Sequence, residues 1–308
     1  MKKKILIIGS LNMDFDIEAN KIPEPGETVL GRSVSHIPGG KGANQAYAAG
    51  RLGGDAAMIG AVGDDPYGSS LIQSLASAGV DTSGIERYSG CSTGQAYIAL
   101  DPSGENSIIV VPGANRLVTP EMIDRHMDLI DSCDYILTQF EIPIETVSYI
   151  KTLAIQKKKH LIVDPAPAVS ELPDGFWKGI DIIKPNETEL SLLSGMQMSS
   201  REEYLAGART MIRKGVSTVV LTLGKLGCLV ATKDQDVFYP AHTVKAVDTT
   251  AAGDSFTAAL VIALSEGKPL AEAVTFAQTV CAIVVTRKGA QSSIPAREEL
   301  SGGDVLSN

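Results

Sequence analysis

The sequence predicts a doubly wound α/β fold, in which helices cover both faces of a mostly parallel β-sheet. Short, continuous apolar runs recur along the chain, as is usual for parallel strands buried on both faces. Segments with helix-start signals lie between them. This alternation is typical of a three-layer α/β/α sandwich. The expected strands are Ile5–Ile8, Ala56–Ala61, Tyr135–Thr138, Leu161–Val163, Ile180–Ile183 and Val219–Leu221.

Three helices have recognisable starts. Thr119 offers a hydroxyl as a helix cap, and Pro120 fits the first turn because no amide hydrogen is needed there. Ser200 and Glu203 have the spacing of a capping box, in which each side chain accepts a backbone N–H of the other residue. Pro269 starts a long apolar final helix. These starts fall between expected strands, as the alternation requires.

Two stretches interrupt the alternation, at about residues 15–38 and 90–112. Both consist of extended segments with turns rather than helical patterns. Within the second stretch, Gln95–Leu100 and Ser107–Val111 should pair across a turn as a hairpin. We expect the two stretches to form a small β-sheet lid over one edge of a single domain that spans residues 1–308.

Composition and charge exclude several classes of protein. The chain of 308 residues is 44% hydrophobic, enough for a core and unlike a disordered protein. With 27 Lys and Arg against 36 Asp and Glu, its formal charge is 27 − 36 = −9, so it lacks the excess of basic residues that is typical of a nucleic-acid-binding protein. No apolar run approaches the roughly 18 residues of a membrane span, and Ile5–Ile8 is shorter than the core of a secretion signal, roughly 7–15 residues. The four cysteines lack Cys-x-x-Cys spacing and are typical of reduced thiols, so we expect a cytoplasmic protein.

Several common catalytic arrangements are absent from the sequence. Lys41 is followed by Gly42, whereas a P-loop needs Ser or Thr after its Gly-Lys pair. No Gly-x-Gly-x-x-Gly follows the first expected strand, which excludes the usual dinucleotide fingerprint. No metal-ligand spacing occurs among the four histidines, His36, His126, His160 and His242.

Pro38–Gly53 is the first of two glycine-rich segments that lead into a helix. Its glycines let the backbone approach a ligand closely because no Cβ stands in the way. Lys41 and Asn44 lie at the helix start, where side chains and free N–H groups can converge on hydroxyls or an anion. The structural alternative is a plain turn into a helix of small residues.

Val247–Leu260 is the second such segment and places Asp254 in the first turn of a helix. The backbone N–H groups of Ala251 to Asp254 can form an anion-binding nest. The structural alternative is that Asp254 only complements the helix dipole. Two such helix starts in one doubly wound chain favour a functional interpretation.

Polar side chains also follow several of the expected strands. In open α/β sheets, ligands bind beyond the carboxyl ends of the strands, so these side chains should share one rim of the sheet. They are Asn12 and Asp14 after the first strand, Glu141 after the third, Asn186 after the fifth and Thr222 after the sixth.

The two glycine-rich segments resemble the two signature motifs of the PfkB-type carbohydrate kinases. Further segments match the family in order and spacing, so the resemblance covers nearly the whole chain. In one departure, Ala251 stands where the family commonly has glycine, which adds only a methyl group. The matching segments are Gly9–Asp14, Gly39–Ala46, Gly113–Asn115, Gln139–Glu141, Pro165–Pro167, Lys184–Glu189, Thr222–Gly224, Asp248–Asp254 and Thr286–Gln291.

The resemblance implies a Rossmann-like kinase domain that phosphorylates a sugar with ATP, and it is strongest to the members that act on the 5-hydroxyl of D-ribose. Asp254 is then the catalytic base that accepts the proton of this hydroxyl. Ala251, Ala252 and Gly253 are then the anion hole for the transferred phosphoryl group. The implied sugar-binding residues are Asn12, Asp14, Gly40, Lys41, Asn44, Glu141 and Asp254.

The resemblance also implies sites for the nucleotide and two cations. Mg²⁺ accompanies ATP near Asn186 and Glu189, partly through water, and K⁺ acts as an activating cation. The small sheet is implied to serve as a lid and as the contact of a homodimer. The implied nucleotide-binding residues are Asn186, Thr222, Gly224, Gly227 and Gln278, and the implied K⁺ residues are Asp248, Thr250, Val284, Arg287, Gly289 and Ser293.

Two other functions stay open from the sequence. The first is another sugar or nucleoside kinase of the same family, acting for example on deoxyribose or fructose. The second is a non-catalytic sugar-binding protein, because a fold alone does not fix function. Retention of Asp254, Asn186 and Glu189 argues against the second, since a pure binding protein needs none of them.

Overall fold

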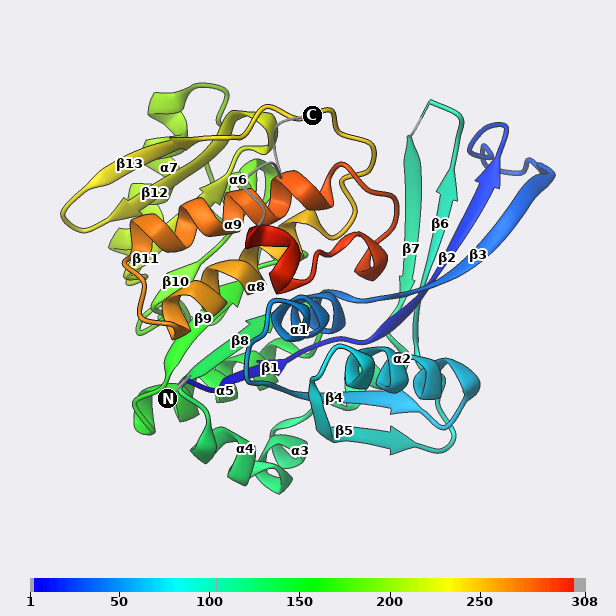
Figure 1. Ribbon diagram of the computed structural model, residues 1–308, viewed down its shortest axis with the longest axis horizontal. Coiled ribbons are helices and arrows are strands. Elements are labelled where there is room, and N and C mark those ends of the chain that lie inside the picture. Colours follow the sequence, from blue (N-terminus) through cyan, green and yellow to red (C-terminus); the bar gives the residue numbers. More distant parts are fainter. Residues whose placement is uncertain (1–2, 104, 302–308) are drawn as a thin grey trace.

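The computed structural model describes residues 3–103 and 105–301, which form a nine-stranded main sheet and a separate four-stranded sheet (Figure 1). The strand order of the main sheet is β13-β12-β11-β10-β9-β8-β1-β4-β5. Neighbours from β11 to β5 pair in parallel, and β12 and β13 extend one edge as antiparallel strands. The strands are β1 (Ile5–Ile8), β4 (Ala56–Gly63), β5 (Asp81–Tyr88), β8 (Tyr135–Gln139), β9 (His160–Asp164), β10 (Ile182–Ile183), β11 (Thr218–Thr222), β12 (Gly227–Thr232) and β13 (Asp236–Pro240).

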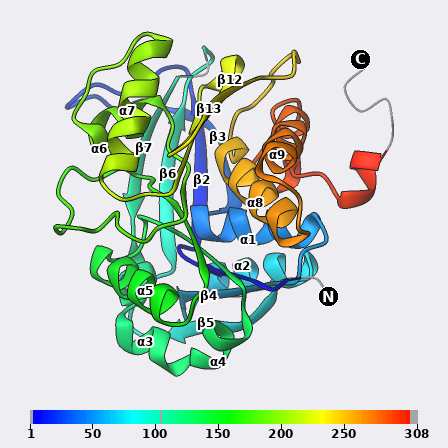
Figure 2. The same ribbon diagram turned by 90° about the vertical axis from the view of Figure 1, so that its left-hand side faces the viewer.

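Helices cover both faces of the main sheet, so the predicted doubly wound three-layer sandwich is confirmed (Figure 2). Side chains of β1 alternate between the two layers: Ile5 and Ile7 enter one core, Leu6 and Ile8 the other. One layer consists of α1 (Lys41–Arg51), α2 (Pro66–Ser77), α8 (Ala252–Ser265) and α9 (Leu270–Val284). The other consists of α3 (Pro120–Arg125), α4 (Met127–Ser132), α5 (Ile144–Gln156), α6 (Glu187–Ser194) and α7 (Arg201–Arg213).

All three predicted helix starts are confirmed. The Thr119 hydroxyl caps α3 by accepting the Met122 N–H, and Ser200 and Glu203 form a reciprocal capping box on α7. Pro269 immediately precedes α9, as its missing amide hydrogen allows. Short 3₁₀ helices complete the described chain: η1 (Gly113–Leu117), η2 (Gly224–Leu226), η3 (Gln291–Ser293) and η4 (Arg297–Ser301).

All six predicted strands occur in the main sheet, although β10 is shorter than expected and begins at Ile182. The prediction missed β5, β12 and β13. Strands β5 and β13 are partly exposed edge strands, so their sequences lack the continuous apolar run that marks a buried parallel strand. Strand β12 pairs antiparallel with β11 and follows it with only the short η2 between them, outside the alternation of strands and α-helices on which the prediction was based.

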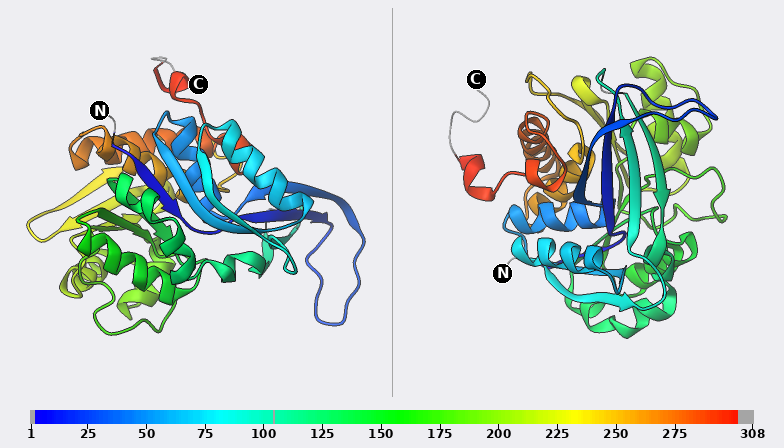
Figure 3. Two further views of the ribbon diagram at one scale, coloured as in Figure 1. Left: turned by 90° about the horizontal axis from the view of Figure 1, so that it is seen from below. Right: turned by 90° about the vertical axis from the view of Figure 1, so that its right-hand side faces the viewer.

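The separate four-stranded sheet, called the small sheet below, projects from the side of the main body (Figure 3). The predicted hairpin is confirmed, since β6 and β7 pair antiparallel. Strand β2 begins at Asn12, earlier than the predicted stretch, so Asn12 and Asp14 lie where the chain passes from β1 into the small sheet. Its strands, in the order β3-β2-β6-β7, are β2 (Asn12–Ala19), β3 (Gly31–Gly39), β6 (Gly94–Leu100) and β7 (Asn106–Val111).

No helix in residues 3–103 and 105–301 is both long and apolar enough to cross a bilayer. The four cysteines are all free thiols.

Candidate active site at the base of the small sheet

The predicted sugar-site residues come together where the small sheet leaves the main sheet. The Asn44 side chain contacts Asp254, and Glu141 contacts the first residues of α1. A cleft of about 720 Å³ lies between the small sheet and the loops that flank α8 and α9. Its lining includes Asp14, Asp16, Ile98, Asp248, Thr250 and Gly289.

The start of α1 differs from the prediction, because protein groups already occupy its backbone N–H groups. Glu141 Oε2 accepts the Lys41 N–H at 3.1 Å, and Ser10 Oγ accepts the Gly42 N–H at 3.3 Å. Ser10 Oγ also donates to Glu141 Oε2 at 2.5 Å, which fixes the carboxylate over the helix end. A carboxylate complements the positive end of a helix dipole, so this start is not a free anion site.

Asp14 lies close to several carboxylates. Burial, together with the negative charges of Glu141, Asp16 and Asp254, raises the pKa of Asp14 to about 8, against a lowering contribution from Lys41. Gly39 pairs with Asn12 across β2 and β3, and a Cβ at position 39 would lie 2.1 Å from Asp14 Oδ2. Glycine at position 39 therefore makes room for the Asp14 side chain.

Lys41 provides positive charge among these groups. Burial alone would lower the pKa of Lys41, but the surrounding carboxylates, first Asp254 and then Glu141, raise it above its ordinary value. The amine therefore stays protonated and acts only as a hydrogen-bond donor.

Asn12 is buried and held by one neighbour. Asn115 Nδ2 donates to Asn12 Oδ1 at 2.8 Å, and Asn115 also exchanges hydrogen bonds with the backbone of Leu11. Because its oxygen is occupied, the Asn12 side chain has its NH₂ group to offer to a ligand.

The start of α8 contrasts with that of α1. Ala251, just before the helix, has a φ of 58°, a left-handed conformation that glycine adopts more readily than alanine. The Ala252 N–H donates to Thr249 O at 3.2 Å. The next two amides, of Gly253 and Asp254, lie in the first helical turn, where no intrahelical acceptor is available. These two are the best placed for an anion.

A buried polar network behind Asp254 was missed by sequence reasoning. Asp164 Oδ2 pairs with Lys184 Nζ at 3.0 Å and accepts hydrogen bonds from Gln45 and Thr257. Lys184 also lies beside the start of α8, since a Cβ on Gly253 would be 3.2 Å from its Nζ. Asp164 and Lys184 stand at the ends of β9 and β10, so the strand-end argument that selected Glu141 applies to them equally.

Asn186 and Glu189 form a reciprocal capping box on α6. Glu189 N–H donates to Asn186 Oδ1 and Asn186 N–H donates to Glu189 Oε2, both at 2.8 Å. Burial, opposed by Lys184, raises the pKa of Glu189. The backbone of Asn186 also forms an isolated parallel β-bridge with Thr222 at the end of β11, so the two residues lie side by side.

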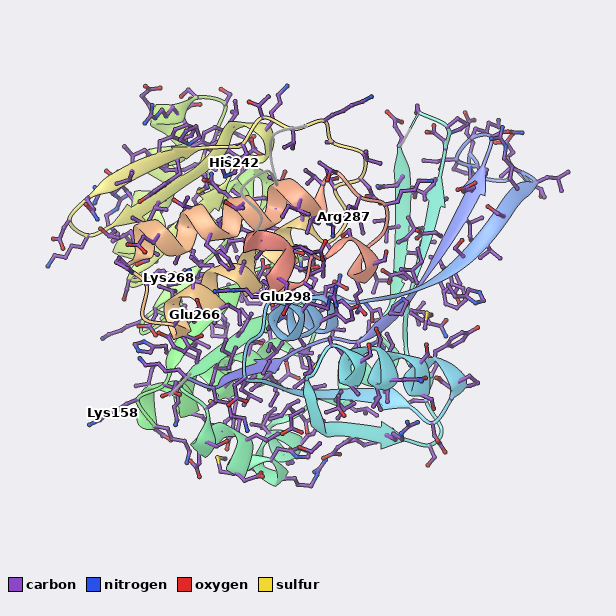
Figure 4. The ribbon with its side chains drawn as sticks, in the orientation of Figure 1. Lys158, His242, Glu266, Lys268, Arg287 and Glu298 are labelled. Carbon is purple, nitrogen blue, oxygen red and sulfur yellow. The ribbon has the colours of Figure 1, made fainter. Side chains whose placement is uncertain are left out.

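The remaining predicted nucleotide residues lie around β12 and α9. Gly224 begins η2, and Gly227 has a φ of 109° at a point where a Cβ would lie 2.0 Å from Tyr239 O. Gln278 is buried, and its Nε2 donates to Tyr239 O at 2.9 Å. His242 lies over the same helix, 3.3 Å from the Thr279 hydroxyl (Figure 4).

Two of the predicted K⁺ segments are joined by hydrogen bonds. Val247 and Asp248 donate their N–H groups to Val285 O, at 2.7 and 3.2 Å. The Asp248 carboxylate accepts from the amide and hydroxyl of Thr250 and from the Gly289 amide. Arg287, which lies just after α9 (Figure 4), does not join this network and forms an ion pair with Glu299. Val284 and Ser293 are buried, and the Ser293 hydroxyl donates to Ala290 O.

Comparisons with known proteins identify the family to which the chain belongs. Residues 2–297 match the model of the pfkB family carbohydrate kinases. The chain is 39% identical to the ribokinase of Haemophilus influenzae over 97% of both chains. It is 36% identical to the deoxyribokinase of Salmonella typhimurium over 96% of this chain and 97% of that one. A solved structure of Arabidopsis thaliana ribokinase, complexed with ribose and ATP, is 31% identical and superposes with a TM-score of 0.92 over the whole of both chains. This chain therefore belongs to the pfkB family of carbohydrate kinases, and it is a sugar-phosphorylating enzyme.

Proposed function

We propose that this protein transfers the γ-phosphoryl group of ATP to the 5-hydroxyl of D-ribose. One observation carries the proposal. Asp254 lies in the first turn of α8, where the Gly253 and Asp254 amides are available, and its carboxylate accepts a hydrogen bond from the Asn44 side chain. A base and an anion-binding helix end therefore meet at one point. Relatives that are ribokinases, at 39% identity, support ribose as the sugar.

The sugar would bind among Asn12, Asp14, Lys41, Asn44 and Glu141, with Gly40 allowing close approach of the backbone. A sugar needs both donors and acceptors around its hydroxyls. The NH₂ of Asn12 and the Lys41 ammonium donate, and the Glu141 carboxylate accepts. Asp14, with a pKa of about 8, donates as the neutral acid or accepts as the carboxylate. Because Glu141 is already bonded to Ser10 and α1, its role is to bind a hydroxyl in a fixed place rather than to move a proton.

Asp254 would accept the proton of the attacking hydroxyl. Phosphoryl transfer depends on alignment and on stabilising negative charge more than on covalent chemistry. The anion hole would be formed mainly by the Gly253 and Asp254 amides, with Ala251 shaping the turn and Ala252 partly engaged by Thr249. Lys184, beside Gly253, would add positive charge there.

ATP would lie along the ends of β10 to β12, against Asn186, Thr222, Gly224, Gly227 and Gln278. The described residues contain no cluster of three or more His, Cys, Asp or Glu side chains arranged for a metal. Glu189 with Asn186 suits Mg²⁺ that is bound mostly by phosphate and water, since one Glu189 oxygen already caps α6. When bound, Mg²⁺ would neutralise phosphate charge during transfer.

K⁺ would bind between the loop of Asp248 and Thr250 and the segment from Val284 to Ser293. The Asp248 carboxylate already accepts three hydrogen bonds, so backbone carbonyls would supply most of the ligands. Such a cation would stabilise the turn that leads to Ala251.

The small sheet would also mediate a homodimer. Strand β7 is an edge strand, and its residues Ile108 to Val111 are exposed and apolar. Unpaired edges with apolar side chains tend to be covered by another chain. The free cysteines suit the reducing cytoplasm as the site of action.

Deoxyribose is the second candidate substrate, because a deoxyribokinase is 36% identical to this chain. A coupled assay of ADP release over ribose, 2-deoxyribose and fructose tests the choice. The highest kcat/KM should be with ribose. A preference for either other sugar would contradict ribose as the substrate, and no ADP release with any sugar would contradict the kinase assignment.

A further inference from the structure

The carboxylate of Asp254 is held on both sides by amides from consecutive residues of α1. Asn44 Nδ2 donates to Oδ2 at 3.0 Å, and Gln45 Nε2 approaches Oδ1 at 3.4 Å. Gln45 is fully buried, and the same Nε2 donates to Asp164 Oδ2 at 2.9 Å. Its NH₂ group therefore lies between two carboxylates.

The orientation of the Gln45 amide is determined by its surroundings. Two carboxylates on one side require the NH₂ group there, because the amide oxygen would be repelled. The oxygen then points the other way, where Gln139 Nε2 donates to it at 2.6 Å. Gln139 is itself buried and fits only because position 9 is glycine, where a Cβ would lie 1.9 Å from Gln139 Oε1. The hydrogen bond from Gln139 thus stabilises the orientation that turns the Gln45 NH₂ group toward the two carboxylates.

We propose that Gln45 is a positioning residue for phosphoryl transfer, which fixes the Asp254 carboxylate for proton acceptance and separates it from Asp164, and that Gln139 acts through Gln45. The inference rests on the proposed function, in which Asp254 is the base. Removing the amide would leave two carboxylates facing each other without a shared donor.

Other charged and titratable groups surround Asp254 and act on its carboxylate together with Gln45. Lys41 of α1 and Lys184 at the end of β10 bring positive charge, and Lys184 is paired with Asp164. Asp14 of β2 and Asp164 of β9 bring negative charge, and the Cys281 thiol of α9 is also near. Burial raises the pKa of Asp164, and the negative charge of Asp254 raises it further, while Lys184 opposes both.

Gln45→Met tests the proposal because it keeps the length and removes the amide. We expect kcat to fall about 10- to 100-fold while the KM values for ribose and ATP change less than about threefold. The acidic limb of the kcat–pH profile should move to higher pH, because a donor to the ionised carboxylate is lost. Gln139→Met, the milder variant, should lower kcat about three- to tenfold, since the amide is then free to turn.

The double variant separates positioning from packing. If Gln139 acts only through Gln45, the double variant should have the kcat of Gln45→Met alone, whereas independent packing effects would multiply. Ser265→Ala is the matched control, since it removes a buried hydrogen bond to Ile262 O at the opposite end of α8 from Asp254. It should lower the melting temperature without changing kcat or the pH profile.

Three outcomes would overturn the inference: a folded Gln45→Met with kcat within twofold of wild type, a Gln139→Met with unchanged kcat, or multiplicative losses in the double variant. The Gln139 measurement serves alone if Gln45→Met does not fold. Asp254→Asn, measured alongside, keeps the two proposals apart. An active Asp254→Asn contradicts the proposed function, whereas an inactive one beside an unaffected Gln45→Met contradicts only the role of Gln45.

Discussion

Asn44 and Asp254, 210 residues apart in sequence, are joined by a hydrogen bond of 3.0 Å between Nδ2 and Oδ2. This bond links the starts of α1 and α8, the two glycine-rich helix starts that the sequence singles out. The chain of hydrogen bonds extends beyond Asn44, since Gln291 Nε2 lies 3.4 Å from Asn44 Oδ1, and Ser74 Oγ donates to Gln291 Oε1 at 2.7 Å. Hydrogen bonds therefore link helix α2, the segment after α9 and the proposed base.

Asp254→Asn should abolish turnover while ribose and nucleotide still bind. The change keeps the size of the side chain and removes the proton acceptor, so kcat should fall at least about 10³-fold. Steady-state kinetics with calorimetric titration of both ligands checks this. Retention of near wild-type kcat would show that another group is the base.

Asn12→Met should narrow the preference for ribose over 2-deoxyribose. The Asn12 oxygen is occupied by Asn115, so its NH₂ group is the part that can bond a hydroxyl, proposed to be the 2-hydroxyl. A site built to bond a hydroxyl rejects the analogue that lacks it, so the ratio of kcat/KM values should fall at least about tenfold. An unchanged ratio of the two kcat/KM values would show that Asn12 does not bond the 2-hydroxyl of the sugar.

The sequence was sufficient to predict which candidate site residues directly follow a strand of the main sheet. Asn12, Glu141, Asn186 and Thr222 lie at the ends of parallel strands, and these ends share one rim in any doubly wound sheet. The same rule would have selected Asp164, which ends β9.

Other features depend on contacts between distant segments and could not be predicted. Occupation of the α1 amides requires Ser10 and Glu141, which are 131 residues apart, to meet over one helix end. Gln45 becomes informative only through Gln139, 94 residues away. A glutamine in a helix carries no local signal of such a role, because its amide is more often solvated.

Ile109→Lys should dissociate the proposed homodimer. Ile109 is 67% exposed on the edge strand β7, and burying a lysine in an apolar contact carries a desolvation cost. Light scattering after size-exclusion chromatography should then give the mass of one chain. Ile155→Lys, at a 52% exposed position on α5, is the matched control and should leave the mass unchanged. A dimer that persists in Ile109→Lys would move the interface away from β7.

K⁺ should raise kcat severalfold at constant ionic strength, with Mg²⁺ present. The Asp248 loop is bonded to Val285 and Gly289, so a cation there would stabilise the turn before α8 without touching the sugar. Na⁺ should activate less, because it is too small for a cage built for K⁺. Equal rates in K⁺, Na⁺ and a bulky organic cation would contradict the cation site and leave the kinase assignment intact.

Asp14→Asn should stabilise the free enzyme at high pH and weaken ribose binding. The pKa of Asp14 in the folded protein, about 8, lies above the ordinary aspartate value of 3.8, so the folded state holds one extra proton between these pH values. Ionising this group therefore costs stability progressively as the pH rises from the lower value, and the cost is complete above the higher one.

The asparagine variant removes that cost. Its melting temperature should exceed that of the wild type by a few degrees at pH 9, on the scale of about 2–4 °C per kcal/mol, and by much less at pH 5. Asp174→Asn, at an exposed loop position, should show no such pH-dependent gain. Above pH 8 the KM for ribose should rise about tenfold, because the amide replaces an ionised carboxylate and keeps only one of its two acceptor oxygens. A melting-temperature difference that is the same at pH 5 and pH 9 would mean that the Asp14 carboxyl ionises as freely in the folded protein as in the unfolded chain.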